Sequence, residues 1–376
     1  MKLKPKVTLL DHFSNLTDPR IDRTKDHKLI DIIAIAICGM LCGADNWVAM
    51  EQYGNAKQEW LQQFLELPNG IPSHDTISRV FARIDPKEFE QCFRDWVKTI
   101  SELIPGEIIS IDGKTAKHSG SKSKGKKAIH IVNAWATEQR LVLGQVKVKN
   151  KSNEITAIPE LIKVLELSGC LVTIDAIGTQ TKIAQLIQDN GADYCLALKE
   201  NQPNLFQQVV NLFDQAEEID WSEVEHDFHR TINKGHGRTE IRRHWTMAVR
   251  RLFFDESKWA GLQSIGLVES VRKIDGETTT NKRYYLNSFR SNAQVLANAV
   301  RKHWEVENNV HWILDVAFKE DDCPVHSDHA PENLAQLRKI SLNLLSSEKT
   351  AKVGVANKRL KAAWDNQYLA KVLGLQ

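Results

Sequence analysis

The sequence lacks an apolar run long enough to cross a membrane. Its longest uncharged apolar stretch, residues 32–44, is shorter than the ~20 residues that a transmembrane helix needs, so we expect a buried core helix there. The first residues carry lysines but neither a sustained apolar segment nor a small-residue cleavage site, which argues against secretion. The six cysteines are scattered, and several lie inside apolar runs, as is typical of a reduced protein. We therefore expect a cytoplasmic protein without a membrane partner.

The chain also lacks a strong overall charge, because 50 lysines and arginines are balanced by 48 acidic residues and the net charge is only +2. Global charge therefore gives no sign of a nucleic-acid partner. The distribution is more informative, since residues 112–153 hold ten basic residues and only two acidic ones. Such a block is often a solvated loop. Here it begins at a candidate active-site carboxylate, Asp112, where contacts to phosphates would be useful.

At 376 residues, of which 42% are hydrophobic, the chain is long enough for two or three domains with real cores. Residues 1–100 have the patterns of helices, including Ser73 and Asp75 at the start of one segment. The spacing of the segments at 46–65 and 71–84 would suit a small helix-turn-helix, but a plain helical bundle is at least as consistent with it. No low-complexity tract or clear internal repeat interrupts the sequence.

From residue 107 the pattern changes to strands and helices. Three consecutive strands joined by short polar turns are followed by two more strands that alternate with helices, in the order βββαβαβα. This order predicts the α/β class, with an RNase H-like mixed sheet flanked by helices. The expected segments are strands at 108–114, 127–137, 141–150, 170–177 and 193–200, and helices at 154–169, 180–192 and 202–215.

The remaining residues return from strands to helices. A β-rich insertion is expected after residue 215, with a hairpin around Asp275 and Gly276. A long helix without proline or glycine follows at 293–318, and further helices are expected at 333–349 and 356–373. The predicted units are an N-terminal helical, DNA-binding domain (1–100), an RNase H-like catalytic domain (107–215 and 291–350), the β-rich insertion (216–290) and a C-terminal helix (351–376).

Two of the predicted strands end in the same way. IISID and LVTID each run through apolar residues to a carboxylate, Asp112 or Asp175, with Ser110 or Thr173 two residues earlier on the same face. If the strands are neighbours, both carboxylates reach the same edge and repel each other unless a cation neutralises them. Oxygen ligands with open positions suit Mg²⁺ or Mn²⁺, and two such ions can promote phosphodiester chemistry. Either aspartate alone could simply start a turn or cap a helix, but the pair favours a metal site.

A third acid is expected from the helix near residue 300, where Glu305, Glu307 and Asp315 are the candidates. Helical spacing places Trp304, Glu307 and His311 on one face and directs Glu305 elsewhere. We expect that face to turn inward and to carry Glu307 toward the two aspartates. On composition alone, it could also be a mixed stripe of core and surface residues.

Five segments in order resemble the signature blocks of a known family: IISIDGK, LVTIDAIGTQ, LALKENQP, KGHGRTEIRR and HWEVENNVHWILDVAFKED. They are similar to those of bacterial insertion-sequence DDE transposases, most of all the H-repeat-associated branch, over nearly the whole chain. The resemblance implies that Asp112, Asp175 and Glu307 form the catalytic, metal-binding triad of a Mg²⁺-dependent enzyme in which Mn²⁺ can substitute. It implies cleavage of element ends and joining of their 3′-hydroxyls to target DNA. The implied partners are double-stranded DNA, at terminal inverted repeats and at the target, and a second copy of the chain, in the bacterial nucleoid.

The resemblance is incomplete around the glutamate. The wider superfamily often carries Tyr, Arg and Lys there, whereas this chain has Val300, His303 and Leu314. His303 could still contact a phosphate. For the missing lysine, the candidate substitutes are Lys199, Lys114 and Arg238.

Further DNA contacts are expected from residues 229–243, a basic segment with two glycines. We interpret it as a flexible, DNA-contacting arm, although a solvated turn would have the same composition. The residues expected to contact DNA are Lys114, Lys117, Lys199, Arg238, Arg242, Arg243 and His303.

Three alternatives stay open at this stage. Cys323, His326 and His329 could bind zinc, but their spacing is tighter than that of a usual zinc finger, and such clusters arise readily in polar loops. The whole chain could be a metal-dependent nuclease on the same fold, although the N-terminal helices and the insertion favour a recombinase. It could also be a catalytically inactive, transposase-derived DNA-binding protein, a hypothesis that the presence of all three acids weakens.

Overall fold

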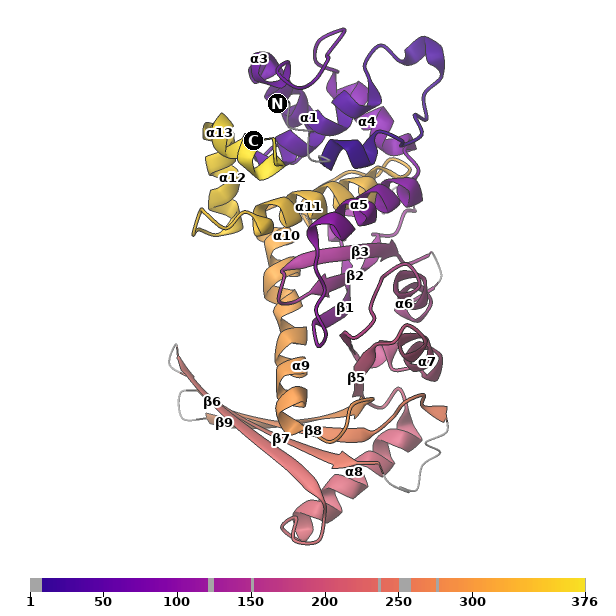
Figure 1. Cartoon of the computed structure of the whole chain (residues 1–376), viewed down its shortest axis with the longest axis vertical. Helices are drawn as coiled ribbons and strands as arrows, with labels where there is room; N and C mark the ends of the chain where they lie inside the picture. Colours follow the sequence, from indigo (N-terminus) through magenta and orange to yellow (C-terminus); the bar gives the residue numbers. More distant parts are fainter. Residues whose placement is uncertain are drawn as a thin grey trace, which may run out of the picture.

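A nine-stranded mixed sheet runs through the molecule (Figure 1). The computed structural model describes residues 9–120, 125–149, 152–235, 238–249, 258–274 and 277–375. The order of the strands is β3-β2-β1-β4-β5-β9-β8-β7-β6. The strands are β1 (Ile108–Thr115), β2 (His130–Ala136), β3 (Leu141–Lys147), β4 (Leu171–Ile174), β5 (Asp193–Leu198), β6 (His226–Gly235), β7 (Arg238–Ala248), β8 (Ser264–Ile274) and β9 (Glu277–Asn287).

Strands β1, β4 and β5 run parallel, and the other neighbouring strands are antiparallel. The order β3-β2-β1-β4-β5 is that of an RNase H-like sheet, so the predicted α/β class is confirmed. The β-rich segment predicted as an insertion continues the same sheet, because β9 pairs with β5 and sets Leu286 opposite Leu196. Asp275 and Gly276, the predicted hairpin turn between β8 and β9, lie outside the described residues.

Helices before the sheet and helices after it pack together around one end of the sheet (Figure 1). The helices of the first hundred residues are η1 (Leu9–Phe13), η2 (Asp22–Thr24), α1 (Leu29–Leu41), α2 (Trp47–Ala56), α3 (Gln58–Leu61), α4 (His74–Arg83) and α5 (Pro86–Ile100). The later ones are η3 (Lys117–Ser119), α6 (Glu154–Ile162), η5 (Ala176–Gly178), α7 (Thr181–Asp189), α8 (Pro203–Glu218), α9 (Ala293–Val306), the π-helical η7 (Glu307–His311), α10 (Trp312–Val316), α11 (Ala330–Ser347), α12 (Val355–Trp364) and α13 (Asn366–Leu373).

Helices α6 and α7 cover one face of the sheet, and α9 crosses the other (Figure 1). The alternation of side chains in β1 explains the two layers. Ile109 and Ile111 join the large core, which also contains the buried residues of α6 and α7. Ile108 joins a smaller core with Leu296 of α9. Asp112 shares the face of Ile108, so α9 is the helix that can reach its carboxylate.

The two ends of the chain share a core with the sheet. Helix α1 is buried along nearly its whole length, as predicted for residues 32–44, and packs against α2, α11 and α12. Helix α11 contacts α1, α4 and α5 as well as β3. The single helix predicted at 356–373 is two helices, because the Asp365 side chain accepts the backbone N–H groups of Gln367 and Tyr368 and starts α13.

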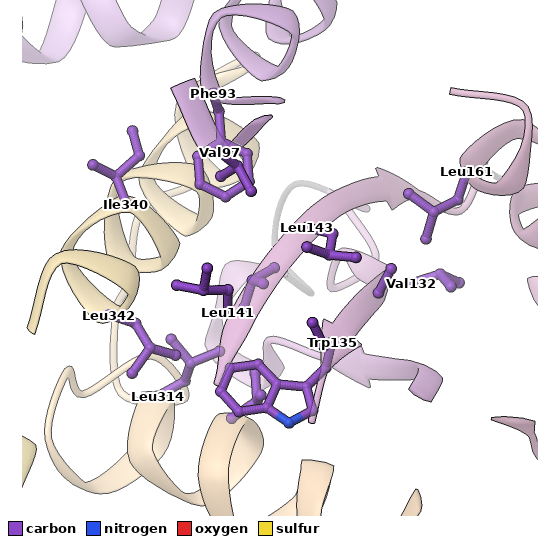
Figure 2. Close-up of a cluster of buried hydrophobic side chains, with 14 of the residues drawn as sticks. Phe93, Val97, Val132, Trp135, Leu141, Leu143, Leu161, Leu314, Ile340 and Leu342 are labelled. Atoms are coloured by element: carbon purple, nitrogen blue, oxygen red, sulfur yellow. The ribbon is translucent and has the colours of Figure 1, made fainter. Parts of the chain in front are cut away.

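Figure 2 shows the apolar cluster in which these layers meet. Its labelled side chains come from α5, α6, α10, α11, β2 and β3, and among them are Phe93, Leu141, Trp135, Leu314 and Ile340. The helix that follows Glu307 is therefore fixed in the same core as the sheet. None of the described helices combines the length and the apolar character that a membrane span requires.

Candidate active site

Asp112 and Asp175 occupy equivalent positions on neighbouring strands, although β1 continues past Asp112 to Thr115 whereas Asp175 directly follows β4. The parallel register of β1 and β4 pairs Ser110 with Thr173, and each aspartate follows two residues later. The hydroxyls of this pair are hydrogen-bonded to each other at 3.2 Å. The structure therefore has the arrangement that the two matching strand ends predict, with both carboxylates at one edge of the sheet.

Both aspartates also have the local roles considered as alternatives. Asp112 Oδ1 accepts the N–H of Gly113 at 2.9 Å, and Asp175 Oδ1 accepts the N–H of Ile177 at 3.1 Å, where it caps η5. Each of these bonds uses one carboxylate oxygen. The turn and the cap are therefore compatible with a shared site and help to orient it.

Glu307 reaches the same edge from the end of α9. Its Oε2 lies 3.2 Å from His311 Nδ1, which lies 3.8 Å from Asp112 Oδ2. One ligand atom from each of these three residues lies within 4.8 Å of the other two. Glu305 instead pairs with Lys302 at 3.4 Å. Among the candidate glutamates, Glu307 is the one beside Asp112.

The face formed by Trp304, Glu307 and His311 turns inward only in part. The His311 side chain is 7% exposed, whereas that of Glu307 is 53% exposed. Trp304 is 49% exposed, and the guanidinium of Arg283 lies 4.8 Å from the centre of its ring. This face therefore borders an open pocket on one side and the protein interior on the other.

The pocket has a volume of about 210 Å³ and opens above the carboxylates. Lys199, predicted as a cation near the acids, lies exposed at the end of β5 and lines this pocket. The polar and aromatic side chains in its wall are Asp112, Thr173, Asp175, Lys199, Arg283, Tyr285, His303, Trp304 and Glu307.

The acids are close enough to perturb one another. Burial, with the negative charges of Asp175, Glu307 and Glu154, raises the pKa of Asp112 to about 7. Burial also raises the pKa of Asp175, and Glu154 adds to that effect while Lys199 opposes it. Two ionised carboxylates are therefore unfavourable here unless a cation joins them. The donor set of carboxylate oxygens and one imidazole fits a divalent metal ion.

His303 lies in the pocket as a neutral group. Its Nδ1 is 3.0 Å from Thr173 Oγ1. Burial, with a contribution from His311, lowers the pKa of His303 to about 4. At neutral pH this ring is uncharged, so it could contact a phosphate only as a neutral hydrogen-bond donor and not as the missing cation.

Glu154 is a fourth acid that the sequence did not bring to notice. It stands in the first turn of α6, with Oε1 2.6 Å from His130 Nε2. A Cβ at Gly113 would lie 2.2 Å from that oxygen, so a larger residue there would force the Glu154 and His130 side chains to move. The sequence did contain one signal for Glu154: it stands in the first turn of the helix after β3, and helices that follow a strand begin at an end of the sheet.

Lys114 does not lie where a DNA contact would need it. Its Nζ is 2.7 Å from Asp315, 3.2 Å from Asp321 and 3.4 Å from Glu320, and the side chain is only 9% exposed. Three carboxylates therefore hold its charge inside the protein. Lys117 pairs with Asp321 at 2.7 Å but is 74% exposed, so it stays accessible to a partner.

The predicted basic arm is part of strands β6 and β7 and not a loop. Neighbouring residues of a strand point to opposite faces, so Arg242 and Arg243 do not line one surface. Arg242 pairs with Glu240 at 2.8 Å in a groove between the sheet and α9, whereas Arg243 pairs with Glu269 outside that groove. The side chain of Arg238 lies outside the described residues.

This groove has a volume of about 1000 Å³ and joins the pocket. Arg283, Val300 and Trp304 line both spaces. The basic residues of the groove are His229, Arg242, His244, Arg272, Arg283 and Arg301.

The cluster considered for zinc has other contacts. Cys323 is buried, and the His326 ring lies 3.2 Å from the carbonyl oxygen of Ser119. His329 stands at the start of α11. In the part of the chain that the structure describes, the group of side chains close enough to hold a metal ion is Asp112, Glu307 and His311.

The fold and the site define a class of protein: a mixed sheet and a crossing helix bring carboxylates together beside a basic groove, as in DDE-type nucleic-acid enzymes. Residues 104–344 match the family described as the transposase DDE domain. Residues 10–97 match the family described as DDE_Tnp_1-associated. The chain belongs to the DDE transposase family.

Known proteins are similar to this chain along nearly its whole length. It is 40% identical over 370 residues to the "H repeat-associated putative transposase YhhI" of Escherichia coli K12, with 97% of each chain covered. It is also 40% identical over 371 residues to the "Putative transposase YncI" of Escherichia coli O157:H7, which covers 97% of this chain and 94% of that one. A chain of the piggyBac transposase synaptic complex with hairpin DNA matches 95% of this chain and 75% of its own length, with a TM-score of 0.45 and 13% identity. The predicted H-repeat-associated resemblance is confirmed.

The raised pKa of Asp112 gives a testable pH dependence. The pKa of Asp112 is about 7 in the folded protein, against about 3.9 for an aspartate in an unfolded chain. Without divalent ions, the folded protein therefore loses stability as the pH rises between these two values, because its carboxyl group must give up a proton that the fold retains. Asp112→Asn removes this loss. Its melting temperature in EDTA should exceed that of the wild type at pH 8, and the gain should shrink toward pH 4. Exposed Asp22 provides the control, since Asp22→Asn should show no such trend, and equal behaviour of the two variants would contradict the burial of charge at Asp112.

The position of Lys114 predicts a structural effect. Lys114→Met leaves Asp315, Glu320 and Asp321 without their shared cation, and loss of one partner from a buried ion pair costs about 3–5 kcal/mol. Denaturant unfolding followed by circular dichroism measures the change in the free energy of unfolding. Lys117→Met is the matched control and should change it little, because exposed pairs contribute about 0–1 kcal/mol. Comparable losses in the two variants would show that the buried cluster does not stabilise the fold.

Proposed function

We propose that this protein is an active DNA transposase that cleaves the ends of its element and joins the freed 3′-hydroxyls to target DNA. The observation that carries the proposal is that Asp112 and Glu307 have ligand atoms within 4.8 Å of each other, while Asp175, on the strand next to that of Asp112, lines the same pocket beside an arginine-lined groove. Membership of the DDE transposase family supports it. We infer that the protein acts in the bacterial cytoplasm, on nucleoid DNA, as a dimer that holds two inverted-repeat ends.

The three acids would hold the metal, Mg²⁺ or Mn²⁺. When bound, a pair of divalent ions activates the attacking oxygen and stabilises the leaving oxygen of a phosphodiester. Asp112 would be one of the ligands, and the hydrogen bond that its carboxylate accepts from the backbone N–H of Gly113 helps to orient it. Glu307 directly follows α9, which packs on the sheet, so its position does not depend on a flexible loop.

The side chains around the acids would position the DNA. Lys199 is exposed beside Asp175 and can bind a phosphate oxygen next to the scissile bond. His303 can donate a hydrogen bond to phosphate without adding a charge. Exposed Trp304, with Arg283 over its ring, offers an apolar surface on which a base can stack.

The groove would hold the duplex that leads to the cut site. Arg242, Arg272 and Arg301 line it and can neutralise successive phosphates. Lys117 and Arg238 remain proposed DNA contacts, although they are not among the described residues that line the groove. Arg243 is a less favourable candidate than its sequence neighbour, since it pairs with Glu269 outside the groove.

The catalytic role of Glu307 can be tested against its near neighbour on the helix. Glu307→Gln removes a charge beside Asp112, so Mg²⁺-dependent cleavage of DNA carrying the flanking ends should fall by orders of magnitude, while folding and DNA binding persist. Glu305→Gln should cost little, because Glu305 pairs with Lys302 away from the acids. Reversed behaviour would refute this assignment. Wild-type protein that binds the ends without cleaving them would favour a DNA-binding protein that has lost catalysis.

The groove can be tested with two adjacent arginines. Arg242→Gln should weaken binding of any duplex and reduce the slope of log affinity against log salt by about 1, because one phosphate contact is lost. Arg243→Gln, on the opposite face of β7, should leave both quantities nearly unchanged. Fluorescence anisotropy over a series of salt concentrations measures them. The groove would be excluded as the DNA path if Arg243→Gln had the larger effect.

A further inference from the structure

We propose that His311 is a metal ligand of the active site, with its imidazole Nδ1 binding the same divalent ion as Asp112 and Glu307. The inference rests on the proposed function, because it assigns a further ligand to that metal site. It also names the class of metal: a site of mixed oxygen and imidazole donors accepts Mn²⁺ and Co²⁺ more readily, relative to Mg²⁺, than a site built from oxygens alone.

The distances around His311 fit one shared ion. Its Nδ1 is 3.2 Å from Glu307 Oε2 and 3.8 Å from Asp112 Oδ2. Ligands at roughly 2.1 Å from an octahedral ion are separated by roughly 3 Å when adjacent and roughly 4.2 Å when opposite. Both observed separations fall within this interval. One ion can therefore lie between His311 Nδ1 and either carboxylate, and the ligand atoms of all three residues lie within 4.8 Å of one another.

The burial of His311 supports a role other than an ordinary surface contact. Its side chain is 7% exposed, and one ring nitrogen is directed at the two carboxylates. The other nitrogen, Nε2, is buried and has no hydrogen-bond partner among the described residues. A buried imidazole with one ring nitrogen directed at two carboxylates has the placement from which histidine can bind a metal ion.

The local backbone also sets this residue apart. Glu307 to His311 form a π-helical turn between α9 and α10, and such turns are frequent at functional sites. The turn begins at the glutamate and ends at the histidine, so both side chains enter the site from consecutive turns of one helix. A hydrogen bond alone, with His311 only orienting Glu307, is the competing explanation that the experiment must exclude.

His303 provides a matched control. It lies two turns earlier in the same helical segment and lines the same pocket, but its Nδ1 is 3.0 Å from the hydroxyl of Thr173. It does not belong to the group of ligand atoms formed by Asp112, Glu307 and His311. A measurement that detects a directly bound imidazole must therefore respond to His311 and not to His303.

The test is pulsed electron paramagnetic resonance of Mn²⁺ bound to the full-length protein, which detects a coordinated histidine through the coupling of its ¹⁴N nucleus. The wild type and His303→Asn should both show this coupling, and His311→Asn should lose it while keeping the wild-type circular dichroism spectrum. Labelling of histidine with ¹⁵N should change the coupling in the wild type. Mn²⁺ bound to the wild type without histidine coupling would overturn the inference whether or not the variants fold, as would coupling lost in His303→Asn instead.

The second measurement is the ratio of the Mn²⁺ affinity to the Mg²⁺ affinity, obtained by competition between the two ions in titration calorimetry. His311→Asn should lower this ratio by about tenfold, which is the lower end of the affinity losses caused by mutations around metal sites. An unchanged ratio would overturn the inference. Asp112→Asn distinguishes a failure of this inference from a failure of the proposed function. If Asp112→Asn binds Mn²⁺ as tightly as the wild type, the metal site is not at these carboxylates and the proposed function fails. If Asp112→Asn loses Mn²⁺ binding but the wild type shows no histidine coupling, only the role of His311 is refuted.

Discussion

The parallel pairing of β1 with β4 is the constraint on which the rest of the site depends. It sets Asp112 and Asp175 at one edge of the sheet and forces two like charges together in a partly buried place. Burial is the largest cause of the raised pKa of Asp112, and the negative charges of Asp175, Glu307 and Glu154 add to it. A shared cation would offset the cost of ionising both carboxylates. The neighbouring residues are consistent with a cation site. Glu307 and Glu154 add negative charge next to the aspartates, which would be unfavourable if the aspartates had a structural role alone.

A network of ion pairs holds the helix that supplies the glutamate. Lys114 follows Asp112 by two residues in β1, and its ammonium binds the carboxylates of Asp315, Glu320 and Asp321 beyond the end of η7. The strand that carries the first acid is thereby tied to the segment just after Glu307. The sequence pattern offered Lys114 as a phosphate contact, but the structure uses its charge to fix the spacing of the acids.

Alternation and helical spacing are properties of short segments, so local patterns were sufficient for the strands and for the different directions of Glu307 and Glu305, of which Glu307 lies beside Asp112. They could not reveal the partners of Lys114, which lie 201 and 207 positions away for Asp315 and Asp321 and follow from tertiary packing alone. Glu154 escaped notice for the same reason. The opposite directions of Arg242 and Arg243 would have followed from strand alternation, but glycines and charges made that segment resemble a loop.

The pairing of β9 with β5 determines how the groove relates to the acids. A separate insertion on flexible linkers would let basic residues approach DNA in many orientations. Here β6 to β9 extend the catalytic sheet itself, and Arg283 of β9 lines both the groove and the pocket. Glu240 pairs with both Arg242 and Arg272, so one carboxylate positions both guanidiniums on the wall of the groove. Backbone hydrogen bonds across the sheet therefore fix the spacing between the arginines of the groove and the acids, and a fixed spacing is what the proposed cleavage at one particular phosphodiester would require.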